Sequence, residues 1–378
     1  MRFLTRSLAS ASIATLLALG LSGCGGNEPA KVYVMGDSLA DVGTFGLKFT
    51  VQDASNPKGF PIWTQLVANQ YSATGNDQCN FYRFTNGNFA ANSQAGCTNY
   101  AIGGGRIVVS AANGGSSNPL TIGTQMAKRA EAGGFGAYDL VLVDGGGNDS
   151  ADLVGAYLGA AAGGEGALRL QAFLLQQLSP TTLQTLFAQD PTGAQAAGAY
   201  MQKLAETFHG QIKTHLLDKG AQRVVVLNVP DITLTPRFRM VLASVTAQAG
   251  KAQADALQAG IRLWIGAFNS QLASLVASDK RVALVDFYGD FSQQVASPAS
   301  FGLTNATDTA CPVKGLGSDG LPEYDFPTCT SSALDATAGK TAGWWKTYSF
   351  SDGFHPTPKG HELMAQSVAR AMSKAGWL

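Results

Sequence analysis

Short runs of apolar, largely β-branched residues recur along the chain, and longer stretches with helical periodicity separate them. Five runs predict strands, at residues 32–35, 98–102, 140–144, 223–228 and 282–287. Each run is apolar along nearly its whole length, which is typical of a strand covered on both faces. The clearest predicted helices lie at residues 196–219, 241–278 and 358–374. Strands that alternate with helices indicate a parallel sheet with helices on both sides.

The wide spacing of these strands predicts long insertions between them. We expect the insertions at residues 45–97, 150–194 and 288–350. The Ala/Gly-rich residues 155–168 predict a loop or a loosely packed helix rather than a linker. No internal repeat and no composition shift marks a domain boundary, so we expect one domain over residues 31–378.

Composition and charge narrow the class of protein. The chain has 378 residues, of which 45% are apolar and 14% are charged, so it can form a sizeable core and is not of the disordered class. Lys plus Arg equals Asp plus Glu at 26 each, and no run of charge stands out. Nothing in this pattern indicates nucleic acid as a partner.

The N-terminus predicts export. Arg2 and Arg6 precede an uncharged run at residues 8–23, shorter than the roughly 20 apolar residues that a membrane span requires. Residues 1–23 therefore predict a signal peptide. The sequence LSGC at 21–24 resembles the bacterial lipobox, which implies lipidation of Cys24, a short tether at residues 24–30 and contact with a membrane through the lipid. Because Gly25 is not aspartate, the resemblance implies an outer-membrane or cell-surface lipoprotein; ordinary periplasmic or secreted export, with Cys24 incidental, is the alternative.

Four further cysteines permit three pairings. Cys79 and Cys97 are 18 positions apart, as are Cys311 and Cys329, and each pair flanks a polar, glycine-containing segment. In an exported protein the simplest interpretation is two local disulfides, Cys79–Cys97 and Cys311–Cys329. No CxxC motif occurs and no histidine lies near these cysteines, so no metal site is expected.

Small and polar residues follow the first three predicted strands. They are Gly36-Asp37-Ser38, then Gly103-Gly104-Gly105, then Gly145 to Asp149. Ligands of open parallel sheets bind beyond the carboxyl ends of the strands, so these segments can meet at one edge.

A serine nucleophile needs a base and a group that orients the base. Of the four histidines, His209 and His215 fit the polar face of a predicted helix, and His361 falls inside the last helix. His355 lies in a turn-rich segment, three residues after Asp352, which lets the carboxylate fold back onto the imidazole.

A tetrahedral intermediate also needs hydrogen-bond donors for its oxyanion. The candidates are the Ser38 N–H, a backbone N–H within residues 103–105, and the side-chain amide of Asn148. Glycine suits the second position because its backbone can approach a ligand closely.

Four ordered motifs resemble those of the GDSL, or SGNH, hydrolases. They are GDSL at 36–39, NYAIGGG at 99–105, GGGND at 145–149 and DGFH at 352–355; RFTNGN at 83–88 and NVPDITLTP at 228–236 are also similar to the family. The resemblance implies a three-layer, flavodoxin-like α/β/α fold with a central five-stranded parallel sheet, and serine-dependent hydrolysis of carboxylic esters without a metal or cofactor.

The resemblance also implies residue roles. Ser38 would be the nucleophile, His355 the base and Asp352 its orienting group, with Asn148 as the oxyanion side chain. Either Gly103 or Gly104 would supply the glycine donor, and we favour Gly104. The G-x-S-x-G motif of α/β-hydrolases is absent from the chain.

Several of these motifs also permit other interpretations. Ser38 with Asp41 fits a helix capping box. The match to G-x-G-x-x-G at 315–320 lacks a preceding strand, and GKT at 339–341 lacks the first glycine of a phosphate-binding loop because Leu334 stands there. The substrate could be a short acyl ester, a phospholipid or an acylated polysaccharide. An acyltransferase with the same triad is one alternative, and a non-catalytic surface lipoprotein is another.

Overall fold

The structure is a computed structural model that describes residues 31–71, 79–161, 163–318 and 320–378. The predicted signal peptide, Cys24 and the tether at 24–30 lie outside the described residues.

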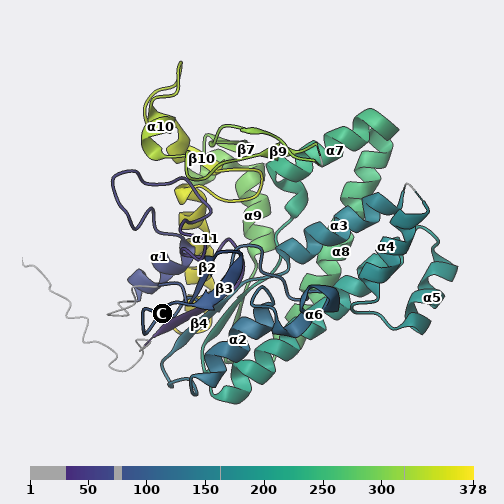
Figure 1. Cartoon of the computed structure of the whole chain (residues 1–378), viewed down its shortest axis with the longest axis horizontal. Helices are drawn as coiled ribbons and strands as arrows, with labels where there is room; N and C mark the ends of the chain where they lie inside the picture. The colour runs from purple at the N-terminus through teal and green to yellow at the C-terminus, as the bar shows by residue number, and fades with distance from the viewer. Residues whose placement is uncertain (1–30, 72–78, 162, 319) are drawn as a thin grey trace, which may run out of the picture.

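A parallel sheet of four strands forms the centre of the molecule (Figure 1). Its order is β1 (Val32–Met35), β4 (Leu140–Val143), β5 (Val224–Leu227) and β6 (Val282–Val285). Every residue of the first three strands is buried, as their continuous apolar sequences predict. All four carboxyl ends lie at the same edge because all the pairings are parallel.

The fifth predicted strand, at residues 98–102, runs beside β1 without becoming a strand of the sheet. Tyr100 N–H donates to Val34 O at 2.7 Å, and a single parallel bridge joins Val34 to Asn99. Gly36 O still accepts Ile102 N–H at 3.2 Å, but Gly36 N–H donates to the side-chain Oε1 of Gln125 at 2.8 Å, so a second bridge does not form. The sheet thus has four strands rather than the expected five, and this segment lies beside β1 at the edge of the sheet.

Helices cover both faces of the sheet, as expected from the alternating pattern. Helices α2 (Ile122–Glu131), α6 (Ala194–His215) and α8 (Lys251–Val276) pack in one apolar cluster with the β1 side chains Tyr33 and Met35. Helices α1 (Trp63–Gln70), α9 (Phe287–Ala296) and α11 (Pro358–Lys374) pack with Val32 and Val34 on the other face. Alternate residues of one strand therefore contribute to separate cores, which produces three layers.

Two predicted helical regions differ from the expectation in their boundaries. The helix expected at 241–278 is divided into α7 (Pro236–Ala249) and α8, because Gly250 has φ +88° and ψ 160° and cannot continue a helix. Residues 155–168 are mostly helical: α3 (Gly147–Ala160) ends within them and α4 (Glu165–Leu174) begins there. Helix α5 (Pro180–Gln189) completes this insertion.

The remaining insertions lie towards the carboxyl edge of the sheet (Figure 1). The strands there are β2 (Tyr82–Thr85), β3 (Asn88–Ala91), β7 (Asn305–Thr309), β8 (Gly315–Leu316), β9 (Pro322–Glu323) and β10 (Tyr348–Phe350). Helix α10 (Ser331–Asp335) lies between β9 and β10 in the chain. Short 3₁₀ turns occupy Ala111–Asn113, Gly115–Ser117, Leu217–Lys219, Ile232–Leu234, Pro298–Phe301 and Trp344–Thr347.

Both predicted disulfides are confirmed. Cys79 is bonded to Cys97, and Cys311 is bonded to Cys329. Disulfides persist in oxidising compartments, so they indicate an extracellular or periplasmic protein. Within the described ranges, none of the helices is long and apolar enough to span a membrane.

Candidate active site

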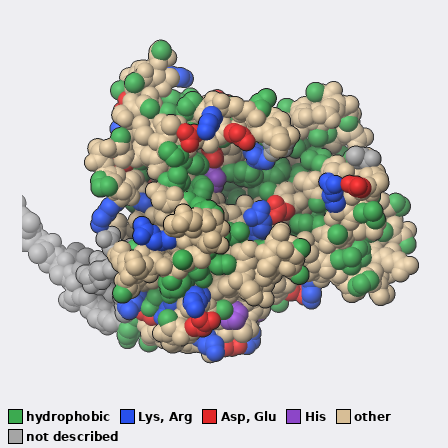
Figure 2. All heavy atoms as spheres, viewed as in Figure 1, with side chains coloured by type: hydrophobic (Ala, Val, Ile, Leu, Met, Phe, Trp, Pro, Cys, Tyr) green, Lys and Arg blue, Asp and Glu red, His purple; other side chains and the backbone are tan. Residues whose placement is uncertain are grey.

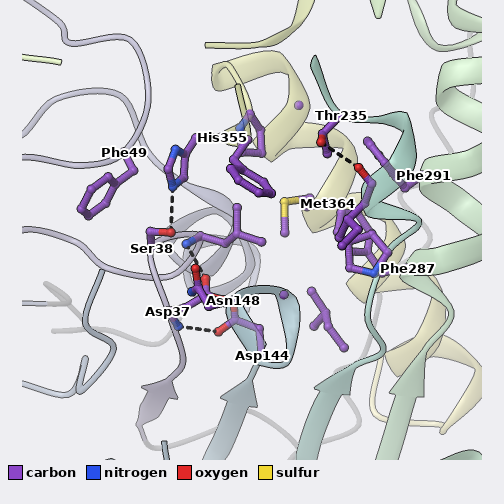
Figure 3. A pocket seen from close by; sticks show the side chains of 18 of the residues that line it. Asp37, Ser38, Phe49, Asp144, Asn148, Thr235, Phe287, Phe291, His355 and Met364 are labelled. Atoms are coloured by element: carbon purple, nitrogen blue, oxygen red, sulfur yellow. Dashed lines mark hydrogen bonds between the residues drawn. The ribbon is translucent and has the colours of Figure 1, made fainter. Parts of the chain in front are cut away.

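Three side chains predicted to act together form one hydrogen-bonded chain. The Nε2 atom of His355 lies 2.7 Å from the Oγ atom of Ser38, and its Nδ1 atom lies 2.8 Å from Oδ2 of Asp352 (Figure 3). The residues come from opposite ends of the sequence, and the carboxyl edge of the sheet brings them together. The serine, the histidine and the carboxylate therefore have the mutual contacts that serine catalysis requires.

Ser38 lies in a tight turn directly after β1. Gly36 is required before it, because a Cβ atom there would lie 1.4 Å from Oδ1 of Asp144. The capping-box interpretation of Ser38 is wrong, since no helix begins in this turn. The Asp41 carboxylate instead accepts the N–H groups of Gly43, Thr44 and Gly103. Asp41 thus ties the turn after Ser38 to the glycine segment beside it.

Asp352 and His355 are held by the turn between β10 and α11. Oδ1 of Asp352 accepts the N–H groups of Phe354 and His355, at 2.8 and 2.6 Å. The imidazole ring stacks on Phe49 at 5.1 Å between centroids, and the edge of Phe326 packs against it at 5.6 Å. The ring orientation is therefore fixed by packing as well as by Asp352.

The two members of this pair shift each other's pKa. Burial tends to lower the pKa of His355, but the Asp352 carboxylate outweighs it, so the pKa lies above the usual 6.5. Burial tends to raise the pKa of Asp352, but His355 and the two N–H donors outweigh it and lower the pKa. The pair therefore favours an ionised Asp352 that stabilises the protonated imidazole.

The glycine segment presents one uncommitted N–H group to the site. Gly103 N–H donates to Asp41 at 2.8 Å, and Gly105 N–H donates to Ile102 O at 2.8 Å. The N–H groups of Gly104 and Ser38 have no hydrogen-bond partner among the described residues, and both residues line the same cavity. Gly104 has φ +81°, a conformation that favours glycine. Both residues are half-buried, so these two N–H groups are accessible from the cavity and available to an anion there.

Arg106 fixes the other side of this glycine turn. Its Nη1 atom donates to Gly104 O at 2.5 Å, and its Nε atom pairs with Asp152 on α3 at 2.5 Å. The carbonyl of Gly104 is thereby hydrogen-bonded to Arg106, which helps to fix the conformation of this turn.

Asn148 lies in the first turn of α3. Its Nδ2 atom donates to Gly105 O at 2.9 Å and makes a long contact of 3.4 Å with Oδ2 of Asp37. One of its two hydrogens is therefore only weakly engaged and can turn to a stronger acceptor. The N-terminus of α3 adds a favourable potential for negative charge here.

A cavity of about 290 Å³ opens beside Ser38. Its walls away from Ser38 and His355 are mainly apolar, although Asn228, Thr235 and Gln294 also line it. The apolar side chains come from β5, α9, β10, the turn before α11, and α11 itself: Leu227, Phe287, Phe291, Phe350, Phe354 and Met364. In Figure 3 Met364 and Phe287 lie across the cavity from Ser38, and Figure 2 shows a hollow in this face with hydrophobic side chains inside. The cavity therefore suits an apolar group attached to a carbonyl at Ser38.

A comparison with models of protein families matches residues 32–368 to the GDSL-like Lipase/Acylhydrolase family. The chain belongs to this family. A comparison with curated proteins finds no significant match. The mixed α/β architecture with its parallel sheet agrees with the fold of these acylhydrolases, and the family supports a hydrolase of ester substrates.

The structure of this GDSL-like acylhydrolase brings together all the residues predicted for the site. Ser38, His355, Asp352, Asn148 and Gly104 line or adjoin one cavity. His209 and His215 are half-buried on α6, and His361 is buried in α11, where its Nδ1 accepts Trp63 N–H at 3.5 Å.

Sequence reasoning missed several residues of the site. No sequence motif indicated a role in the site for Arg106, Phe49 or Asp144. Asp41 was considered only as part of a capping box with Ser38. The two segments that matched nucleotide-binding patterns have other structural contacts. Residues 315–316 form β8 of a small antiparallel sheet, and Lys340 lies over the Trp344 ring.

Proposed function

We propose that this protein is an exported serine hydrolase of carboxylic esters, with Ser38 as nucleophile, His355 as general base and Asp352 as its orienting group. The observation that carries the proposal is the continuous hydrogen-bonded chain from Ser38 Oγ through both ring nitrogens of His355 to Asp352. A surface lipoprotein without catalysis has no need of such a chain.

In the first half of the proposed reaction, Ser38 Oγ attacks the ester carbonyl while His355 Nε2 accepts the hydroxyl proton. The negatively charged carbonyl oxygen accepts hydrogen bonds from the N–H groups of Ser38 and Gly104 and from Nδ2 of Asn148, which stabilise it. His355 then gives the proton to the departing alcohol, which leaves an acyl group on Ser38. Gly104 is preferred to Gly103 because the Gly103 N–H already donates to Asp41.

In the second half, water replaces the alcohol. His355 Nε2 accepts a proton from the water, whose oxygen attacks the acyl carbonyl, and the same proton returns to Ser38 as the acid departs. An acyltransferase would differ only in that an alcohol takes the place of this water.

The cavity supports an ester with an apolar acyl group of short or medium length, or the corresponding lipid ester. Its lining beyond Ser38 comes mostly from aromatic and aliphatic side chains, and no Lys or Arg of the described part of the chain lines it. A phospholipid, lysophospholipid or other acyl ester presents the same acyl chemistry at Ser38.

The test is hydrolysis of p-nitrophenyl esters from acetate to palmitate by the chain from Gly25 onward. The matched variants are Ser38→Ala and Ser55→Ala, which removes an exposed hydroxyl outside the cavity. We expect turnover by the parent and Ser55→Ala and none by Ser38→Ala, with all three equally folded. Full activity in Ser38→Ala would overturn the assignment. Added glycerol separates hydrolase from transferase, because only a transferase would form mainly the glycerol ester.

We also propose that residues 31–378 are one catalytic domain, tethered by residues 24–30 to a lipidated Cys24. The family match over 32–368 and the disulfides support an exported unit of this extent. Labelled palmitate fed to expressing cells should enter the parent and not Cys24→Ser; absence of label from the parent would favour simple secretion.

A further inference from the structure

Two buried carboxyl groups lie beside each other next to Ser38. Asp37 is 4% exposed and Asp144, at the end of β4, is 3% exposed. Asp37 N–H donates to Oδ1 of Asp144 at 3.3 Å (Figure 3), and the two side-chain carboxyl groups interact with each other. Oδ2 of Asp144 is buried and accepts no N–H or O–H donor among the described residues. This oxygen has no satisfactory partner if Asp144 is ionised.

The groups around the pair compensate one negative charge, not two. Asp37 Oδ1 accepts Leu39 N–H at 2.9 Å, its Oδ2 contacts Asn148 at 3.4 Å, and His355 and Arg106 both interact favourably with its charge. Among the described residues, the charged group that acts most strongly on Asp144 is Asp37 itself, and its effect is repulsive. Two adjacent buried carboxylates with this little compensation would be strongly destabilising, so the pair retains one proton.

The surroundings place that proton on Asp144. Burial, followed by the charge of Asp37, raises the pKa of Asp144 well above 3.8. Burial also raises the pKa of Asp37, but Leu39 N–H and His355 oppose it. If Oδ2 of Asp144 carries this proton, the otherwise unpartnered oxygen can donate a hydrogen bond to Asp37.

We propose that Asp144 is a positioning residue of this site: its carboxyl group stays protonated and donates a hydrogen bond to Asp37, which in turn holds the Ser38 turn and Asn148 in their relative positions. The inference rests on the proposed function, because it concerns the same nucleophile and oxyanion donor. When Asp144 loses its proton, the two carboxylates repel, and the displacement of Asp37 moves the turn that carries Ser38.

The consequence is that kcat should fall at alkaline pH because Asp144 loses its proton. Asparagine at this position keeps a donor at every pH, whereas alanine has none. Asp139, at the opposite end of β4 and 5% exposed, provides a matched control because it lies away from the cavity. The variants are therefore Asp144→Asn, Asp144→Ala and Asp139→Asn.

We expect Asp144→Asn to keep the neutral kcat within a few-fold and to lose the decline of kcat at alkaline pH. Asp144→Ala should lose kcat by about 100-fold at neutral pH with a small change in KM, because a modest displacement of reacting groups has that effect. Asp139→Asn should follow the parent. An alkaline decline in Asp144→Asn identical to that of the parent, or full activity in Asp144→Ala, would overturn the positioning role.

An infrared difference spectrum provides a readout that does not depend on turnover. The parent minus Asp144→Asn spectrum at neutral pH should contain the carbonyl stretch of a protonated carboxylic acid. Absence of this band overturns the proposal. If the band is present and the parent hydrolyses no ester, the proposed function fails while the protonated Asp144 stands.

Discussion

The imidazole of His355 lies 2.7 Å from the hydroxyl of Ser38, although 317 positions separate the two residues in the chain. Ser38 follows the first strand and His355 precedes the last helix, so the contact exists only when β1 and β10 end near the same edge of the fold. Phe49 and Phe326, from two different insertions, hold the imidazole from two sides.

Replacing Asp352 by asparagine should lower kcat on the order of 10³- to 10⁴-fold, because the amide cannot stabilise the imidazolium and favours the wrong tautomer. In the parent the base must be neutral, so kcat/KM should rise as the pH passes the pKa of His355, which lies above 6.5. Without the Asp352 carboxylate that pKa falls, and the rise should move to lower pH. Profiles of kcat/KM against pH for both proteins provide the measurement.

An aspartate away from the cavity supplies the control for this change. Asp53→Asn lies outside the cavity and should reproduce the parent profile. An unshifted profile in Asp352→Asn would contradict the role of this carboxylate in setting the His355 pKa.

Replacing Asn148 by alanine should lower kcat by about 10²- to 10³-fold, the effect of removing one oxyanion donor. KM should change much less, because the contact strengthens only when charge develops on the carbonyl oxygen. Single-turnover acylation rates measure this directly, beside Asn113→Ala, which alters an exposed asparagine. A loss seen in KM alone would indicate that Asn148 binds the substrate and not the oxyanion.

Replacing Met364 by alanine should extend the preferred acyl chain. Met364 lines the cavity, while Met372 lies on the same helix with the same 1% exposure and does not line it. Each truncation should lower the free energy of unfolding by about 2–5 kcal/mol. Only Met364→Ala should shift the p-nitrophenyl ester profile towards longer chains; equal profiles would show that the acyl group lies elsewhere.

The two disulfides should differ in their effect on activity. Each closes a loop whose bond is worth about 3 kcal/mol in the chain-entropy model, so Cys79→Ser/Cys97→Ser and Cys311→Ser/Cys329→Ser should both lower Tm. Phe326, which packs against His355, lies inside the second loop, so only that variant should also lower kcat. Melting curves and kcat below the lowest Tm test this. An unchanged kcat in the second variant would indicate that Phe326 does not need the disulfide to hold the imidazole.

Much of the fold could be predicted from local pattern. Continuous apolar runs such as residues 140–144 identified the buried strands, because such a run is stable only between two apolar layers. The pattern could not show that the segment at 98–102 remains outside the ladder, since that depends on a side chain of α2, Gln125, which takes the Gly36 N–H. The break at Gly250 was likewise missed, because helical periodicity continues on both sides of it.

The sequence by itself determined which chemistry was available: a serine at the end of a strand, a histidine three residues after an aspartate, and glycines and an asparagine after neighbouring strands. These signals are local, because the turns that they specify need only adjacent residues. The tertiary structure decided which groups are free to act. The Asp41 carboxylate accepts the Gly103 N–H, so the Gly104 N–H is the one left for the cavity. Asp37 contacts Asp144, which is more than a hundred residues away in the sequence. Such choices depend on contacts between distant segments, and the hydrogen-bond partners and burial that set them come into existence only when the chain has folded.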